Sequence, residues 1–369
     1  MELMKVPYIN LGLQHQKDKQ RILTKVSELL DSGMFILGDE VKQFEERFAT
    51  LCGTKYAVGV ANGTDALVLA LQSLGIGKGD EVITAPNSYL ASGSSIALCG
   101  ATPVFADVRE DYNIDPVQVR KKITDKTKAI IPVHLTGRPA PMDEINMIAK
   151  EFNLHVVEDA AQAVGAQYKN KAVGCLSDVA CFSLHPLKNL SAIGDAGIMT
   201  TNNKEIYEWL LKARSHGMKS RDECEFWSMN SRLDAVQAAI LNIKIGNIKE
   251  WTERRRGIAA KYVQELGHLV HVPKEQAFEK SVYHTFIIMT AHRDALQKHL
   301  HEHGVDSKIH YPIAIHQQDA AQQLKSSHDA FPETEKQITQ ILSLPVYPEL
   351  TDEQVNHVCA QVKSFFKSI

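Results

Sequence analysis

Residues 128–161, KAIIPVHLTGRPAPMDEINMIAKEFNLHVVEDAA, contain two apolar runs that flank a segment with helical spacing. The runs KAIIPVHL (128–135) and LHVVEDAA (154–161) are short and rich in valine and isoleucine, which is typical of buried strands. The segment MDEINMIAKEF between them predicts a helix. A strand, a crossover helix and a second strand form a βαβ unit, so these residues predict a parallel sheet.

The same alternation of strands and helices extends from about residue 55 to residue 200. Five further strand-like runs are YAVGVA (56–61), DEVITAP (80–86), TPVFADV (102–108), VACFSL (179–184) and GIMTTN (197–202). Together the runs predict an α/β fold with a mainly parallel, mixed, seven-stranded sheet that helices cover on both faces.

From about residue 203 the pattern changes to long helical segments. The longest, LDAVQAAILNIKIGNIKEWTERRRGIAAKYVQEL (233–266), is followed beyond residue 270 by shorter apolar pieces that alternate with polar helices. This change predicts a smaller α+β domain at the C-terminus. We expect a large domain over residues 1–250, including the N-terminal segment, and a small domain over residues 251–369.

The composition excludes several classes of protein. Of 369 residues, 44% are apolar and 23% are charged, and the net charge of -3 gives no basic surface for nucleic acid or anionic membrane. No apolar run approaches the ~18 residues of a membrane span, and the N-terminus lacks a signal-peptide pattern. The six cysteines are dispersed without a Cys-x-x-Cys pair, which predicts reduced, buried thiols in a cytoplasmic protein.

Ligands of open α/β sheets bind at the carboxyl ends of the strands, so the residues there are candidates for a functional site. After the first strand comes NGTD (62–65), in which Gly63 and Thr64 would open a helix. Free N–H groups and the helix dipole make such a helix start an anion site, although an ordinary helix cap would have the same sequence.

Asp159 and Lys188 lie at the ends of two other strands. Asp159 follows LHVVE, and a carboxylate there needs either a structural salt bridge or a functional partner. Lys188 lies in HPLKNLSAIGDAG after VACFSL, where it is either a solvated loop residue or an amine of lowered pKa that attacks carbonyl groups.

A phosphate site, a buried aspartate and an imine-forming lysine are together what pyridoxal 5′-phosphate (PLP) requires. The aspartate would keep the pyridine nitrogen protonated, and the lysine would hold the aldehyde carbon. Tyr89, after the strand at 80–86, is an aromatic residue that would stack on the ring or simply pack in the core.

The chain resembles the DegT/DnrJ/EryC1/StrS family of sugar aminotransferases in ordered motifs that cover nearly its whole length. The matching motifs are NGTDAL (62–67), GATPVFADV (100–108), HLTGRPAPMD (134–143), EDAAQAVGA (158–166), FSLHPLKNLSAIGDAG (182–197), NSRLDAVQAAIL (230–241) and IHYPIAIHQQ (309–318). The resemblance implies fold type I of PLP-dependent transferases, that of aspartate aminotransferase. It also implies a homodimer that binds neither nucleic acid nor membrane and holds no catalytic metal.

The resemblance assigns a role to each residue that matches a family motif. Lys188 resembles the Schiff-base lysine, and Asp159 the partner of the pyridine nitrogen. The remaining matches are Gly63, Thr64 and Ser183 at the phosphate, Gln162 near the ring hydroxyl, Tyr89 stacked on the ring, Asn230 at the phosphate of a second subunit, and His310, Tyr311 and His316 on the substrate side. Thr136 and Ser231 depart from the aromatic residues that the family often has there, so we expect both near the substrate.

The implied reaction moves an amino group from L-glutamate to a keto sugar in cell-surface polysaccharide or amino-sugar biosynthesis, with pyridoxamine 5′-phosphate (PMP) as the intermediate form. Freed Lys188 would act as general acid and base. A nucleotide-linked 3- or 4-keto-6-deoxy sugar is the first expectation, and a free keto-ulosonic acid of the 8-oxo-Kdo type is the alternative. The motifs specify neither the sugar carbon nor whether glutamate or glutamine is the donor.

Other functions fit the sequence less well. A PLP- or PMP-dependent sugar dehydratase of the same family would carry histidine where Lys188 stands. The glycines of GIGKGD (75–80) precede a strand instead of following one, and Asp80 replaces the last glycine of a dinucleotide fingerprint. The histidines of HLHEH (299–303) lack a matched set of metal ligands. A purely regulatory role would not require Lys188, Asp159 and the phosphate residues together.

Overall fold

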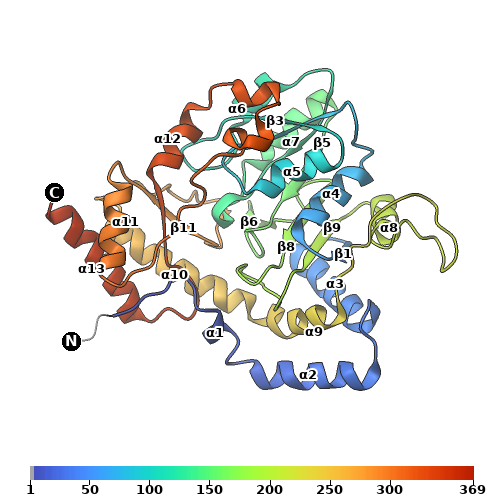
Figure 1. The fold of residues 1–369 in the computed structure, drawn as a ribbon, viewed down its shortest axis with the longest axis horizontal. Coiled ribbons are helices and arrows are strands. Elements are labelled where there is room, and N and C mark those ends of the chain that lie inside the picture. The colour runs from blue at the N-terminus through green and yellow to red at the C-terminus, as the bar shows by residue number, and fades with distance from the viewer. Residues whose placement is uncertain (1–3) are drawn as a thin grey trace.

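The computed structural model describes residues 4–369, and its central feature is a seven-stranded sheet (Figure 1). The strands are β1 (Tyr56–Val60), β2 (Glu81–Thr84), β3 (Thr102–Phe105), β4 (Thr127–Ile131), β5 (His155–Asp159), β8 (Val179–Ser183) and β9 (Gly197–Thr201). Their order is β1-β9-β8-β5-β4-β2-β3, in which β9 is antiparallel to both neighbours and the other pairs are parallel. The prediction of a mainly parallel, mixed, seven-stranded sheet is confirmed.

Helices cover both faces of this sheet, because successive strand residues point to opposite sides. On β5, Val157 packs with α4, α5 and α8, whereas the adjacent Val156 packs with α6 and α7 on the other face. Helices α3 and α9 complete that second face beside β8 and β9. The bounds are α3 (Gly38–Cys52), α4 (Gly63–Ser73), α5 (Leu90–Leu98), α6 (Pro116–Lys122), α7 (Met142–Phe152), α8 (Lys204–Ala213) and α9 (Ala235–Lys244).

The C-terminal part of the chain builds a second core around a short antiparallel sheet. This sheet pairs β11 (Phe286–Met289) with β12 (Ile341–Leu344), and helices α10 (Ile248–Leu266), α11 (Arg293–Glu302) and α13 (Asp352–Lys367) pack around it. Val6 also belongs to this core and forms a parallel bridge with Val305. Val6 thus packs with the C-terminal part, whereas Ile22 and Leu29 farther along the N-terminal segment pack on α9. The assignment of the whole N-terminal segment to the large domain stays a prediction; residues 1–3 lie outside the described residues.

The long helix expected over residues 233–266 is interrupted. Helix α9 ends at Lys244, the 3₁₀ turn η2 (Ile245–Asn247) follows, and α10 then begins. The first turn of α10, with Ile248 and Trp251, packs in the core beside the large sheet, while its later residues pack in the second core. Because α10 belongs to both cores, the domain boundary near residue 250 stays a prediction.

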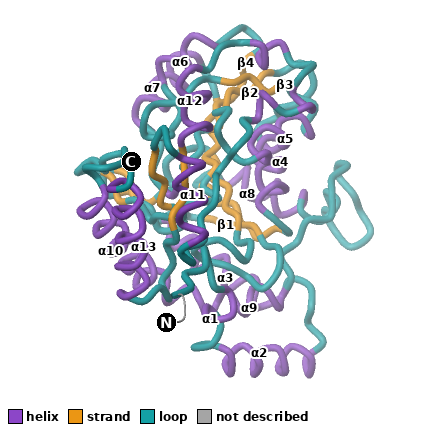
Figure 2. Tube along the Cα trace, turned by 60° about the vertical axis from the view of Figure 1, so that its left-hand side comes forward, coloured by secondary structure: helices purple, strands orange, loops and turns teal. Residues whose placement is uncertain are grey.

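The remaining elements are short or lie at the edges of the fold. A three-stranded sheet in the order β10-β6-β7 joins the two parts of the chain through strands of two residues each, too short for a sequence pattern to predict. The bounds are α1 (Leu11–Gln14), α2 (Lys19–Ser32), β6 (Gln167–Tyr168), β7 (Lys171–Ala172), η1 (Leu135–Gly137), β10 (Glu279–Lys280), η3 (Ile315–Gln317), η4 (Asp319–Ala321), η5 (Lys325–His328) and α12 (Pro332–Gln340). Helix α2 lies at the margin of the molecule, beside α9 (Figures 1 and 2).

All six cysteines are free, in agreement with the predicted reduced thiols, but they are not all buried. Cys52, Cys181 and Cys359 are buried, whereas Cys224 is exposed on the loop after α8. Between residues 4 and 369, none of the helices is both long and apolar enough to span a bilayer.

Candidate active site

The candidate site is built at the edge of the sheet where β5 and β8 end and α4 begins. Ser183 ends β8, and Gly63 is the first residue of α4, which follows β1 after a two-residue connection. A Cβ atom on Gly63 would lie 2.8 Å from the Cβ of Ser183, so only glycine permits this close approach. The start of α4 and the end of β8 thus form one surface.

This surface has the properties of an anion site. Asn62 caps α4 by accepting a hydrogen bond from the Asp65 N–H at 2.8 Å. The other N–H groups of the first turn, including that of Thr64, have no partner within the helix, and the helix dipole is positive at this end. A phosphate group would therefore be stabilised beside Gly63, Thr64 and Ser183.

Ser231, which we expected near the substrate, supports the α4 start instead. Its side chain is fully buried, and its hydroxyl donates to Asp65 Oδ2 at 2.6 Å while accepting from the Ala61 N–H at 3.1 Å. A larger aromatic residue could not make these two bonds in the same space. Ser231 therefore positions the helix start, and its place near the substrate stays a prediction.

Asp159 is 5% exposed and its carboxylate is held by two donors. The Ser92 hydroxyl donates to Oδ2 at 2.7 Å, and the Ala161 N–H donates to Oδ1 at 3.2 Å. The Ser88 hydroxyl lies 2.8 Å from that of Ser92. Sequence reasoning missed both serines, although Ser92 lies three residues after Tyr89 and therefore on the same side of α5.

Glu158, the neighbour of Asp159, points to the opposite face of β5 and has a structural role. Its buried carboxylate accepts hydrogen bonds from the Gly174 N–H, the Leu176 N–H and the Ser177 hydroxyl at 2.8–3.0 Å. It also lies 2.9 Å from His134 Nε2. Of the two adjacent carboxylates, only that of Asp159 is directed toward the candidate site.

Lys188 lies on the loop after β8 and is partly buried. Burial lowers the pKa of its amine to about 8, although the charge of Asp159 opposes the shift. Between residues 4 and 369 the Lys188 amine has no hydrogen-bond partner within the chain. A free amine with a pKa near neutrality can act as a nucleophile, in contrast to a solvated surface lysine.

Gln162, Tyr311 and Tyr89 meet on another side of the site. Gln162 Nε2 donates to the Tyr311 hydroxyl at 3.5 Å, and the rings of Tyr311 and Tyr89 are 5.7 Å apart. Burial raises the pKa of Tyr311, and the Asp159 charge adds to the shift. These residues come from three distant segments of the chain, so the structure brings the predicted residues together.

Two uncharged histidines flank Lys188. Burial, followed by the charge of Lys188, lowers the pKa of His310 to about 4, and His310 Nδ1 lies 2.9 Å from the Ser343 hydroxyl. The same causes lower the pKa of His284 well below its usual value. Sequence reasoning missed His284, whose Nδ1 is 3.3 Å from the side-chain oxygen of Asn189.

His316 and Asn230 lie outside this group of residues. His316 is 4% exposed and packs between Phe331 and Phe105, with ring centroids 4.5 Å and 6.4 Å away. Asn230 is exposed and lines an open surface pocket of about 340 Å³ together with Ala61 and Asp195. Roles for both residues stay predictions.

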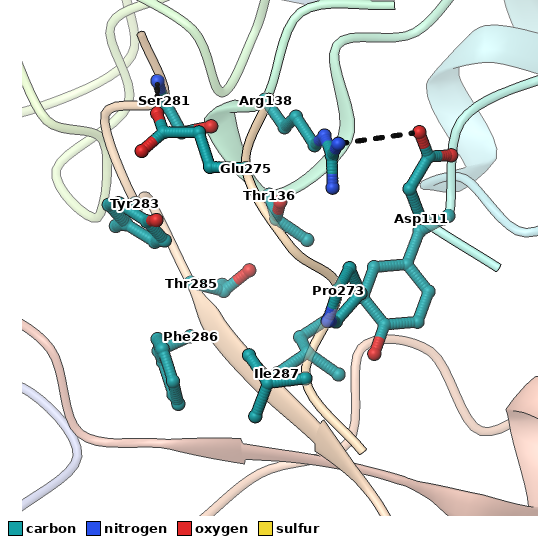
Figure 3. A pocket seen from close by; sticks show the side chains of 12 residues that line it. Asp111, Thr136, Arg138, Pro273, Glu275, Ser281, Tyr283, Thr285, Phe286 and Ile287 are labelled. Atoms are coloured by element: carbon teal, nitrogen blue, oxygen red, sulfur yellow. Dashed lines mark hydrogen bonds and ion pairs between the residues drawn. The ribbon is translucent and has the colours of Figure 1, made fainter. Parts of the chain in front are cut away.

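Thr136 lines a pocket that Lys188 does not line. This pocket is small, with a cavity volume of about 30 Å³, and lies between the loop of Asp111, the segment 136–138 and the start of β11 at Phe286 (Figure 3). Thr136 has a φ of 64°, which a β-branched residue rarely adopts. Its side chain faces this pocket while its N–H donates to Gln162 Oε1 at 2.7 Å, so Thr136 contacts the site through its backbone.

The residues present fit PLP. The close approach of Gly63 to Ser183, which a Cβ would prevent, puts the N–H groups of the helix start beside the end of β8, and the chain adds a buried carboxylate and a free amine. These are the donors and acceptors that a phosphate, a pyridine nitrogen and an aldehyde require.

The Gly63→Ala variant should lose at least about tenfold in PLP affinity, because the added methyl group would push α4 away from Ser183. The measurement is an absorbance titration of cofactor-free protein with PLP. Gly257→Ala is the matched control, since a Cβ there would meet no atom within 4 Å. Equal affinity of the two variants would show that this surface does not bind the phosphate.

Comparison with known proteins gives a consistent result. Residues 16–363 match the model of the DegT/DnrJ/EryC1/StrS aminotransferase family. The chain is 43% identical to a pleiotropic regulatory protein of Geobacillus stearothermophilus, with 99% of each chain covered. It is 42% identical to the dTDP-3-amino-3,6-dideoxy-alpha-D-galactopyranose transaminase of Aneurinibacillus thermoaerophilus, over 98% of this chain and 99% of the relative.

A solved structure agrees with these sequence relatives. The crystal structure of DesV from S. venezuelae in complex with a ketimine intermediate is 39% identical, has a TM-score of 0.96 and covers 99% of both chains. The chain therefore belongs to the DegT/DnrJ/EryC1/StrS aminotransferase family.

Proposed function

We propose that this protein is a PLP-dependent aminotransferase that moves an amino group from L-glutamate to a nucleotide-linked 3- or 4-keto-6-deoxy sugar. The observation that carries the proposal is the Lys188 amine, whose pKa is lowered to about 8 beside the buried Asp159. The transaminase of A. thermoaerophilus, which is named for a dTDP-linked aminosugar, supports this class of substrate.

The residues of the chain divide the work of the reaction among them. When bound, PLP supplies a ring that withdraws electrons from a substrate carbon attached through nitrogen. The α4 N–H groups and Ser183 bind the phosphate, and the Asp159 carboxylate, fixed by Ser92, holds a proton on the ring nitrogen. Lys188 Nζ would hold the cofactor, and when free it would serve as the base and acid that moves the proton of the substrate carbon.

The neutral histidines and Tyr311 leave the sugar side of the site without fixed positive charge. His310 and His284 carry lowered pKa values, and Tyr311 keeps its proton because burial raises its pKa. Neutral donors and acceptors of this kind are suited to the hydroxyl groups of a sugar ring. The phosphates of a nucleotide would lie farther out, toward the open surface.

The test is a transfer of label from ¹⁵N-glutamate to a panel of keto sugars, with the position of the new amine located by NMR. We expect label in a nucleotide-linked keto sugar. If label appears only in a free keto-ulosonic acid, the proposed substrate class is wrong, but the proposed reaction, transamination of a keto sugar, still holds. No label in any keto sugar, with glutamate or glutamine as donor, would contradict the proposed function.

We further propose that the site is completed in a homodimer by Asn230 of a second copy. Exposed apolar side chains gather on α2 and on the turn after it, and they include Leu23, Leu30, Phe35 and Ile36. This surface continues to the open pocket that Asn230 and Ile36 line. A contiguous exposed apolar surface next to a site is typical of a subunit interface.

Mixing two inactive variants tests this arrangement. If Asn230 acts across the interface, subunits with Lys188→Ala and subunits with Asn230→Ala will form mixed dimers in which one site carries both native residues. Random pairing of equal amounts gives mixed dimers in about half of all cases, and one of the two sites in each is intact. About a quarter of the wild-type activity should therefore return. The control is mixing each variant with itself after the same dissociation step. No recovery in dimers shown to be mixed would place Asn230 in the site of its own chain or outside it.

A further inference from the structure

Helix α9 holds the loop that carries Lys188 at two points. The Ile193 N–H donates to Gln237 Oε1 at 2.9 Å. Lys244 Nζ donates to the Ser191 carbonyl oxygen at 2.7 Å and lies 3.1 Å from the Ser191 hydroxyl. Gln237 and Lys244 are seven residues apart on α9, which places them on one side of the helix, two turns apart.

Lys244 is an unusual residue for this position. It is among the largest fully buried side chains of the fold, and between residues 4 and 369 no carboxylate forms an ion pair with it. Burial lowers the pKa of its amine to about 8, while the more distant Asp18 and Glu349 oppose the shift. A buried amine is costly unless hydrogen bonds stabilise it, and Ser191 provides both of the bonds that Lys244 makes.

The backbone around Lys188 is held by this anchor and by other contacts, among them the hydrogen bond that the Ala192 N–H donates to the Leu184 carbonyl oxygen at 2.8 Å. On the other side of the loop, the Asn189 side chain donates to the Val282 carbonyl oxygen at 3.1 Å. Because the Lys188 amine has no hydrogen-bond partner within the described chain, its position is set by the backbone of residues 189–193. Losing the anchor at Ser191 would let the loop move away from Asp159 and admit water to the amine.

We infer that Lys244, together with Gln237, is a positioning residue that holds Lys188 in the desolvated place where it reacts. Lys244 acts on Lys188 through its two hydrogen bonds to Ser191. The inference rests on the proposed role of Lys188 and adds to it the groups that keep Lys188 reactive.

The experiment compares Lys244→Met and Gln237→Met with the wild-type protein by two readouts. The first, made on cofactor-free protein, is the pH dependence of Lys188 acetylation, quantified by mass spectrometry. We expect its midpoint to rise by about one pH unit in Lys244→Met, because the amine becomes more solvated. The second is the rate at which PLP and borohydride label Lys188, which should fall about tenfold.

Arg138→Met is the control for a loss of stability alone. Arg138 is also a buried cation, bonded to the Lys274 carbonyl oxygen at 3.0 Å and to Glu279 at 2.8 Å, and it makes no hydrogen bond to residues 184–196 among the described residues. The Arg138→Met variant should lower the unfolding temperature at least as much as Lys244→Met does, but it should leave the titration of Lys188 unchanged. Ser191→Ala, which removes only the 3.1 Å contact, should shift the midpoint in the same direction by less.

The outcomes separate this inference from the proposed function. Failure of PLP and borohydride to label Lys188 in wild-type protein would overturn the role of Lys188 itself. Normal labelling in wild type, together with an unchanged midpoint and rate in both Lys244→Met and Gln237→Met, would overturn the positioning role. If Lys244→Met does not fold, the acetylation midpoints and labelling rates of Gln237→Met and Ser191→Ala are compared with those of Arg138→Met. Values equal to those of Arg138→Met would overturn the positioning role.

Discussion

The Lys188→Met protein is expected to show no transamination, with a loss of at least about 10⁴-fold in kcat. Methionine matches the length and shape of lysine but has no amine, so it cannot attach the cofactor or move a proton between the two carbons. The phosphate contacts at α4 do not involve Lys188, and PLP should therefore still bind without covalent attachment. The measurements are turnover with ¹⁵N-glutamate and retention of PLP after gel filtration, with and without borohydride.

Lys169→Met is the matched control for this variant. Lys169 is an exposed lysine on the turn between β6 and β7, where its amine pairs with Asp143. The Lys169→Met variant should retain wild-type turnover. Transamination by Lys188→Met above the level of free PLP would show that another base carries out the proton transfer, and His185, three residues upstream, would be the first residue to replace.

Replacing Asp159 by asparagine should lower kcat by about 10²–10³-fold. The change removes a charge but keeps the size of the side chain, and it leaves the Ser92 hydroxyl a carbonyl oxygen to donate to. Without the carboxylate, the ring nitrogen would lose its proton and withdraw fewer electrons from the substrate carbon.

The control for Asp159→Asn is Ser92→Ala, which removes one hydrogen bond and keeps the charge. It should lower kcat by no more than about tenfold. The spectrum of bound PLP, recorded as a function of pH, reports the protonation of the ring directly. Equal kcat values for Asp159→Asn and Ser92→Ala would contradict the assigned role of the carboxylate.

Cofactor-free Lys188→Met should also be more stable than cofactor-free wild type. In the fold the pKa of Lys188 is about 8, below its usual 10.5, so the charged amine is destabilising at pH 7. Removing it should raise the free energy of unfolding at pH 7 by on the order of 2 kcal/mol. Because the unfolded chain binds more protons between pH 8 and 10.5, wild-type stability rises over that range and the difference disappears. Urea unfolding of both proteins at pH 7 and pH 10 measures the difference in their free energies of unfolding at each pH.

The sequence predicts the large sheet well because each of its strands is a continuous apolar run followed by a helix or turn. The residues that end these strands, Asp159 and Ser183, could be placed for the same reason. Ser92 and His284 could not, since their partners Asp159 and Asn189 lie 67 and 95 residues away along the chain. Such hydrogen bonds depend on how distant segments pack, which no local pattern records.

The sequence does not predict where the side chains of Thr136 and Ser231 point, because the direction of a side chain is not a property of its motif. The φ of 64° at Thr136 turns its side chain toward the pocket lined by Arg138 and Phe286. Ser231 directly follows Asn230, yet its backbone N–H bonds to the Arg214 carbonyl oxygen and its side chain is fully buried. Both residues influence the site, one through Gln162 and the other through Asp65.

The parallel bridge between Val6 and Val305 joins two segments that are far apart along the sequence. Val6 and α13 belong to the same core, and the described start of the chain lies on the same side of the molecule as α13 (Figure 1). Along the sequence, the seven-stranded sheet therefore lies between two segments that pack together in one core. Residues 251–369 expressed alone would lack Val6 and the first residues of α10, and should therefore be less stable than the same segment within the whole chain.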